Sequence, residues 1–84
     1  MKRLIEESKF GLESLIGERI TLFCANYIYT GKLTGVNDSF VQLTNAAIIY
    51  ETGSFDDPAW KDAQPLPQVW QVMIHAIESW GILK

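Results

Sequence analysis

Apolar and polar side chains alternate one by one along the first half of the chain. In residues 18–25 the apolar Ile20, Leu22 and Cys24 occupy every second position, which places them on one face of a β-strand. Two further stretches keep the same period, at residues 27–36 and 39–50. The pattern therefore predicts three consecutive strands within about thirty residues.

Glycine and asparagine punctuate these strands. Gly31 and Gly35 fall inside the second strand, where glycine normally weakens the pairing. We explain them by sharp coiling and close backbone approach, as a small barrel requires. Asn26 supplies the turn after the first strand, and the third strand is expected to bend near Asn45.

The segments before and after this core follow other patterns. Residues 2–15 have an amphipathic period typical of a helix, which Gly11 weakens and Gly17 ends. Residues 51–67 have no sustained period and hold three prolines, so a long loop is expected there. Alternation returns in residues 69–74 and 77–83, two strands joined by a tight turn at His75-Ala76.

The expected fold class is therefore mostly β. An N-terminal α-helix precedes a five-stranded, strongly bent antiparallel sheet, and the 84 residues form a single domain, 1–84. No apolar run reaches the roughly 18 residues that a membrane span needs. A single cysteine, Cys24, fits a cytoplasmic protein, so we expect a soluble, cytoplasmic chain with no membrane partner.

The net charge of −3 is concentrated in one segment. Residues 51–62 hold four acids and one lysine, a net of −3, whereas the other six acids and six bases of the chain cancel. Binding to duplex DNA needs clustered Lys and Arg, so we do not expect it. Phe55 and Trp60 in the acidic loop favour a loop that packs on its own barrel, with a basic protein partner as the alternative.

The order and spacing of several motifs carry a family resemblance. The stretch Leu15–Tyr50 contains a Leu-Ile-Gly step, an asparagine turn at Asn26 and the bend Gly31-Lys32-Leu33. It resembles the first Sm motif of Sm-like (LSm and Hfq) proteins. The turn His75-Ala76 is similar to the corresponding turn of Hfq. These families are small bent barrels that assemble into rings and usually bind RNA.

The resemblance implies a working unit and a binding site. It implies a homo-oligomeric ring of five to seven subunits, in which strand four of one copy pairs with strand five of the next. The turns after strands two and four are then expected to meet at the pore and bind single-stranded, U-rich or A/U-rich RNA. The RNA-binding candidates are Asn37, Asp38, Ser39, Phe40, His75 and Ala76.

Each candidate also has an ordinary structural explanation. Phe40 and His75 can sandwich a base, or they can be a core aromatic and a polar turn residue. Asn37, Asp38 and Ser39 can bond base edges or ribose hydroxyls, but such residues also shape turns by bonding their own backbone. The chain departs from both families at this site, because Ile74 and His75 stand where they carry Lys or Arg.

Catalysis is not expected. Cys24, His75 and Asp38 supply a nominal nucleophile, base and acid, but no local signature surrounds Cys24, which alternates with apolar residues as a buried side chain does. No phosphate-binding glycine loop and no metal-ligand spacing occurs, so we expect neither cofactor nor metal. The alternative to RNA binding is a ring scaffold or protein-interaction module.

Overall fold

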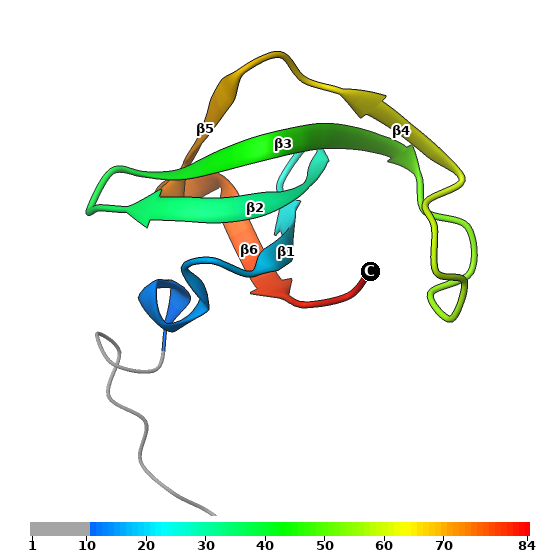
Figure 1. Cartoon of the computed structure of the whole chain (residues 1–84), viewed down its shortest axis with the longest axis horizontal. Coiled ribbons are helices and arrows are strands. Elements are labelled where there is room, and N and C mark those ends of the chain that lie inside the picture. The colour runs from blue at the N-terminus through cyan, green and yellow to red at the C-terminus, as the bar shows by residue number, and fades with distance from the viewer. Residues whose placement is uncertain (1–10) are drawn as a thin grey trace, which may run out of the picture.

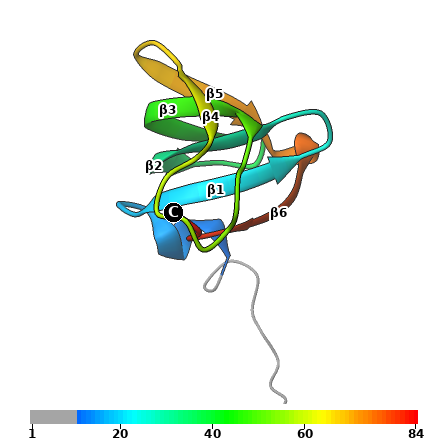
Figure 2. The same cartoon turned by 90° about the vertical axis from the view of Figure 1, so that its right-hand side faces the viewer.

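The computed structural model describes residues 11–84, and these form an antiparallel sheet of six strands (Figures 1 and 2). The strands are β1 (Arg19–Cys24), β2 (Ile28–Val36), β3 (Phe40–Glu51), β4 (Asp62–Pro65), β5 (Val69–Met73) and β6 (Ile77–Gly81). A short 3-10 turn, η1 (Leu12–Leu15), precedes the sheet, and a second, η2 (Ile74–Ala76), joins β5 to β6. The fold is mostly β, as the sequence predicts.

The long strand β3 organises the sheet. Its residues pair with β2 along one edge, while β5 and β4 share the other edge. The strand order is β4-β3-β2-β1-β6, with β5 beside the first half of β3. Because β6 pairs only with β1, and β5 only with β3, the sheet of residues 11–84 stays open rather than closing on itself.

The sheet bends where Gly31 faces β3. A Cβ at Gly31 would lie 3.1 Å from both Ala46 Cα and Leu43 Cβ, so any larger residue would push these neighbours by a few tenths of an ångström. Asn45 has a positive φ of 49°, and the β2–β3 register shifts at Gly31. The predicted close approach at Gly31 is confirmed, and the positive φ of Asn45 lies where the sequence predicts a bend of β3. At Gly35 the nearest atom is an ordinary 3.8 Å away, so that glycine is not needed for space.

The main core lies on one face of the bent sheet. Its buried members come from η1 and four strands, in the alternating positions that the sequence predicts for the strands. They are Leu12, Ile20, Leu22, Leu33, Val41, Leu43, Ala46 and Val72. Burial of aliphatic side chains is the main stabilising contribution to a fold of this size.

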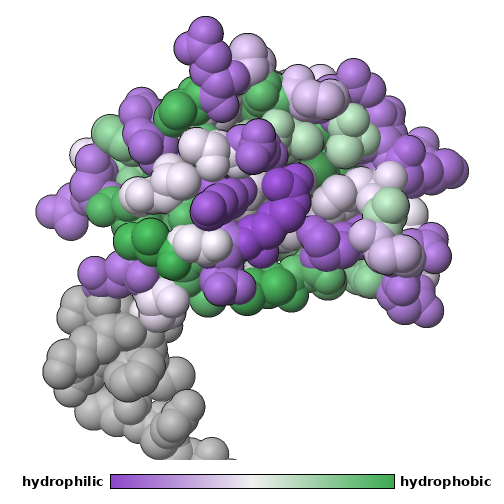
Figure 3. All heavy atoms as spheres, in the orientation of Figure 1, coloured by the Kyte–Doolittle hydropathy of each residue, from purple (hydrophilic) through white to green (hydrophobic). Residues whose placement is uncertain are grey.

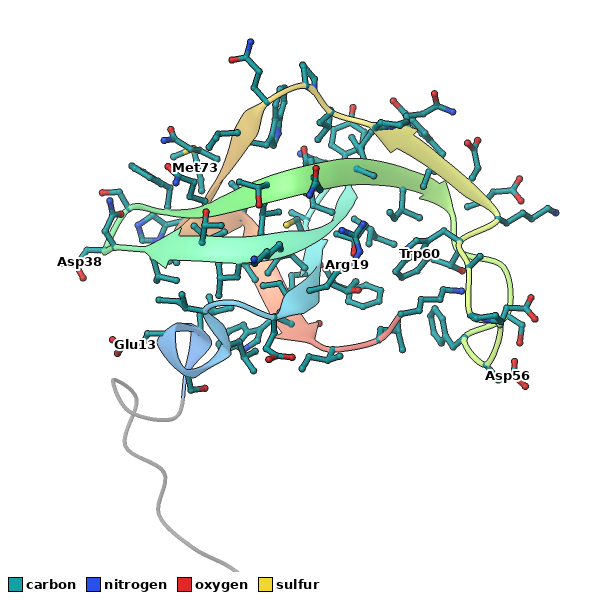
Figure 4. The ribbon with its side chains drawn as sticks, in the orientation of Figure 1. Glu13, Arg19, Asp38, Asp56, Trp60 and Met73 are labelled. Atoms are coloured by element: carbon teal, nitrogen blue, oxygen red, sulfur yellow. The ribbon has the colours of Figure 1, made fainter. Side chains whose placement is uncertain are left out.

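The opposite face is also buried at one end of the sheet. Thr21 and Thr30 are fully buried there, and Ala47 and Ile49 nearly so. The Thr30 hydroxyl donates a hydrogen bond to Ile20 O at 3.0 Å, which satisfies it in this apolar setting. Figure 4 shows Trp60 of the β3–β4 loop below the end of β3. This end of the sheet is therefore covered on both faces.

The predicted helix 2–15 is wrong within the described residues. Residues 2–10 lie outside the described part of the chain, and the rest forms only the 3-10 turn η1. Ile16 already has an extended ψ of 128°, and Gly17 has a φ of 99°. Gly17 N then donates to Leu33 O at 2.8 Å, so strand pairing replaces helical bonding directly after η1.

The segment 51–67 is not loop throughout, which is a second correction. Residues 62–65 form β4, so the sheet has six strands rather than five. Pro65 argues against a strand by sequence, but β4 lies at an edge, where a missing N–H costs little. No helix of residues 11–84 is long and apolar enough to cross a membrane.

Candidate functional site

Two turns that are distant in sequence meet at one end of the sheet. Ile74 N, at the start of η2, donates a hydrogen bond to Ser39 O at 2.9 Å, in the turn between β2 and β3. Directly beside it, Phe40 and Met73 are register partners in the β3–β5 ladder. Figure 4 shows Asp38 and Met73 at this same end. We call residues 37–40 and 73–76 the turn pair.

Asn37 builds the first of these turns. Its Oδ1 accepts hydrogen bonds from Ser39 N at 2.7 Å and Phe40 N at 2.8 Å, and Asn37 N donates to Phe40 O at 3.0 Å. This is an Asx turn, in which the side chain replaces a backbone acceptor. The structural explanation of Asn37 is therefore confirmed, and its oxygen is already occupied by its own backbone.

The other candidates differ in exposure. Asp38, Ser39 and His75 are exposed, whereas Phe40 and Ala76 are half-buried. Ala76 O accepts a hydrogen bond from Ala25 N at 2.9 Å, so η2 is tied to the β1–β2 turn as well. The structure thus brings all six sequence-predicted residues to one end and holds them by backbone hydrogen bonds, which leaves the side chains of Asp38 and His75 toward solvent.

Met73 also belongs to this surface, although the sequence analysis does not identify it. Its side chain is 65% exposed, the highest exposure among the large apolar residues of the described chain, and it stands opposite Phe40. Alternation along β5 carries the signal, because the buried Val72 places its neighbour Met73 on the outer face. An exposed thioether next to an aromatic ring is an adaptable apolar contact surface.

Positive charge is scarce at the turn pair. Residues 36–41 and 73–78 contain no Lys or Arg, and Asp38 adds a negative charge. Arg19 donates to Asn45 O at 3.1 Å, away from the turns, and Lys61 pairs with Glu51 at 3.0 Å. In Figure 3, hydrophobic residues gather at the left and along the lower rim, whereas the right-hand end is mostly hydrophilic. The chemistry available at the turn pair is therefore stacking, apolar contact and hydrogen bonding by the exposed Asp38, Ser39 and His75, without a Lys or Arg to pair with a phosphate.

Cys24 lies next to this end but has the wrong electrostatics for a nucleophile. Burial, with a further contribution from Glu78, raises the pKa of the Cys24 thiol above its ordinary value of 9.0. A nucleophilic cysteine needs the opposite shift. Within residues 11–84 there is no group of three or more His, Cys, Asp or Glu side chains that could hold a metal ion.

The opposite end carries a self-anchored loop. Phe55 packs edge-on against Phe23 of β1, with ring centroids 6.3 Å apart at 84°. Lys84 Nζ lies 4.4 Å from the centre of the Trp60 ring and donates hydrogen bonds to backbone carbonyls of residues 52–59. The predicted packing of this loop on its own domain is confirmed, although the sheet on which it packs is open rather than a closed barrel.

Comparison with known proteins does not assign this chain to a family. The sequence matches no protein-family model and no curated protein sequence. The case for a function therefore depends on the strand order, the turn pair and the open sheet edges.

Proposed function

We propose that this chain is an Sm-like, ring-forming protein that binds single-stranded RNA, U-rich or A/U-rich, at the turn pair. The observation that supports it most is the hydrogen bond between Ile74 N and Ser39 O at 2.9 Å. It joins the turns after β2 and after β5, which correspond to the two turns that bind RNA in Sm-like proteins. The placement of β5 and β6 at open edges of the sheet supports the ring.

Ring assembly follows from the edges. The strands β5 and β6 are each five residues long, and neither pairs with a second strand inside the described chain. Each therefore offers a row of N–H and C=O groups that template another strand. A contact between β5 of one copy and β6 of the next uses two different surfaces, so it closes into a ring by rotation. Met73 on β5 and Trp80 on β6, 65% and 45% exposed, then become buried.

Light scattering tests the ring directly. We expect a molar mass of five to seven chains at micromolar concentration, and a shift toward monomer in Met73→Lys, because the variant places a charge at the edge of β5. Thr34→Lys, which puts the same charge on the exposed Thr34 of β2, is the matched control and should keep the ring. A monomeric wild-type chain would refute the assembly.

RNA binding would rest on stacking. Phe40 supplies a half-buried aromatic ring next to the exposed His75 turn, and stacking of one base on an aromatic side chain contributes about 1–3 kcal/mol. With no Lys or Arg in the turn pair, few counterions are released on binding. We therefore expect a shallow dependence of affinity on salt.

Fluorescence anisotropy with labelled oligo-U and oligo-A, at low and moderate salt, tests this site. Phe40→Ala in an intact ring should cost about 1–3 kcal/mol per engaged base, and His75→Ala should also weaken binding. Lys61→Ala, whose lysine pairs with Glu51 in the acidic segment, should have little effect. If Phe40→Ala binds normally while Lys2 or Arg3 substitutions abolish binding, the turn pair is not the RNA site.

A ring scaffold without RNA binding is the second candidate. Two observations favour it: the turn pair lacks cations, and Asp38 is exposed there and would repel a phosphate. The same anisotropy experiment separates the two functions. An intact ring that binds neither oligonucleotide at low salt would establish the scaffold.

A further inference from the structure

The loop between β3 and β4 encloses a charged group. Lys84 Nζ donates hydrogen bonds to three backbone carbonyls, those of Thr52 at 2.8 Å, Ser54 at 2.9 Å and Ala59 at 3.2 Å. The face of Trp60 lies 4.4 Å from the same nitrogen, measured to the ring centroid. We call residues 52–60 the ammonium cage. Figure 4 shows Trp60 and Asp56 on either side of the end of the chain trace.

The number and kind of these contacts match one chemical group. A lysine ammonium has three N–H donors and no acceptor, and here three carbonyls each receive one hydrogen bond. A tryptophan face attracts a cation at this range. A guanidinium is a planar fork, so it cannot direct three N–H bonds from one nitrogen, and a trimethylammonium has no N–H at all. The geometry therefore selects a primary ammonium.

The loop's own contacts hold the carbonyls in position. Asp57 N donates to Ser54 O at 3.1 Å, and the Ser54 hydroxyl donates to the Asp56 carboxylate. Gly53 has a φ of 68°, and a Cβ there would lie 3.2 Å from Lys61 Cβ, so the turn depends on glycine. Phe55 anchors the loop on Phe23. None of these contacts involves Lys84, so the cage has support that does not depend on its occupant.

Local charge also favours a cation. The hydrogen bond from the Ser54 hydroxyl lowers the pKa of the Asp56 carboxyl. The backbone N–H of Asp56 and the charge of Lys84 lower this pKa further. Asp56 is therefore ionised at neutral pH, with Asp57 beside it in the sequence. The lysine that occupies the cage is distant in sequence, since Lys84 is 32 residues from Thr52.

We propose that residues 52–60 form a binding site specific for primary ammonium groups, which Lys84 fills as an intramolecular ligand and which accepts a lysine side chain of a basic partner when Lys84 leaves. Lys84 competes at the high effective concentration of a tethered group, on the order of millimolar. External amines therefore bind weakly to the intact chain and measurably to a chain without this lysine. The proposal depends on neither the ring nor RNA binding.

The test uses the full chain and the indole N–H resonance of Trp60, assigned with Trp60→Phe. Lys84→Met should shift this resonance, and Nα-acetyl-lysine amide at millimolar concentration should shift it back toward the wild-type position. The trimethylated form of the same probe should have at least tenfold weaker effect. Lys32→Met, which removes an equal charge from an exposed position on β2, should leave the resonance in place.

Two outcomes would overturn the proposal. If Lys84→Met leaves the Trp60 resonance unmoved, the cage does not hold Lys84 in solution. If the resonance moves but the two probes act alike, or neither acts, the site does not select ammonium and the contact serves only to anchor residue 84. Gly53→Ala in the Lys84→Met background gives an independent check, because distortion of the carbonyls should abolish the response to the lysine probe while Phe55 still anchors the loop.

Discussion

The two ends of the sheet are held in opposite ways. At the turn pair, a backbone hydrogen bond from Ile74 N to Ser39 O joins the two turns and the Asn37 amide oxygen fixes the first one, while the side chains of Asp38 and His75 face solvent. At the other end, side chains make the connections, through Phe55 on Phe23 and Lys84 in the ammonium cage. The turn pair therefore keeps exposed side chains for contact with a ligand, whereas the groups of the β3–β4 loop are engaged within the chain as long as Lys84 occupies the cage.

Loop length explains the contrast. The β2–β3 turn has three residues between its strands, 37–39, and one asparagine oxygen is enough to fix it. The β3–β4 connection has ten, 52–61, and ordering each residue costs about 1–2 kcal/mol of backbone entropy. A longer loop therefore needs anchors of its own, and Phe55, Trp60 and Lys84 provide them.

The largest effect is expected at Gly31, where β2 approaches β3 most tightly among the glycines with known surroundings. Gly31→Ala would place a Cβ 3.1 Å from Ala46 Cα and Leu43 Cβ, and overpacking of this kind costs about 1–3 kcal/mol. Gly35→Ala is the matched control on the same strand, where the nearest atom is 3.8 Å away, and it should stay within about 0.5 kcal/mol. Urea unfolding of the three proteins measures the difference. Equal effects at both glycines would contradict the tight approach.

The turn pair should respond to loss of its asparagine. Asn37→Ala removes the acceptor of two backbone N–H groups and should cost about 1 kcal/mol, since a net hydrogen bond contributes about 0.5–1.5 kcal/mol. Asp38→Ala, at an exposed side chain in the same turn, should be close to neutral. Hydrogen exchange should accelerate at Ser39 and Phe40 in Asn37→Ala only. Faster exchange throughout residues 52–60 in this variant would show that the two ends are coupled.

The self-anchored loop should respond to loss of Phe55. Phe55→Ala removes the edge-on contact with Phe23, and aromatic pairs of this kind contribute about 0.5–1.5 kcal/mol beyond area burial. Because Phe55 is 56% exposed, we expect the lower part of that range. Tyr50→Ala, at a side chain of similar exposure (59%), is the control. Hydrogen exchange should increase within residues 52–60 and leave the turn pair unchanged, and protection that persists in Phe55→Ala would show that Lys84 alone holds the loop.

The sequence predicts the core strands better than it predicts the edge strand β4 and the N-terminal turn η1. Period-two alternation correctly predicts β1, β2, β3 and β5, which supply buried side chains to the main core, and β6, from which the half-buried Ile77 packs against it. It misses β4, a four-residue edge strand that contains Pro65 and no fully buried side chain. It also predicts a helix where η1 is a single turn, because amphipathic spacing in residues 11–15 does not reveal that Gly17 pairs with Leu33.

The candidate site shows the same limit. The six RNA-binding candidates come from the family resemblance, and local chemistry predicts only the shape of the first turn, as the Asx turn at Asn37 shows. The cage is not found, because Lys84 meets Thr52 across 32 residues, and a lysine at that distance carries no local signal. Long-range contacts of exposed polar side chains are set by tertiary geometry, and the pattern of a single sequence does not encode them.

The smallest expected effect concerns the ionisation and reactivity of the Cys24 thiol, beside the turn pair. Its raised pKa, due first to burial and then to Glu78, means that the folded protein binds the thiol proton more tightly than the unfolded chain does. This contribution to stability is fully present below the ordinary thiol pKa of 9.0 and is lost as pH rises through the higher folded value. Iodoacetamide should therefore alkylate the folded protein more slowly than the urea-unfolded chain at pH 8, and the ratio of the two rates should fall as pH rises through the folded pKa. Glu78→Gln should speed the folded reaction only slightly, because burial is the larger cause. A folded rate equal to the unfolded rate at pH 8 would contradict the raised pKa and show that the Cys24 end of β1 opens to solvent.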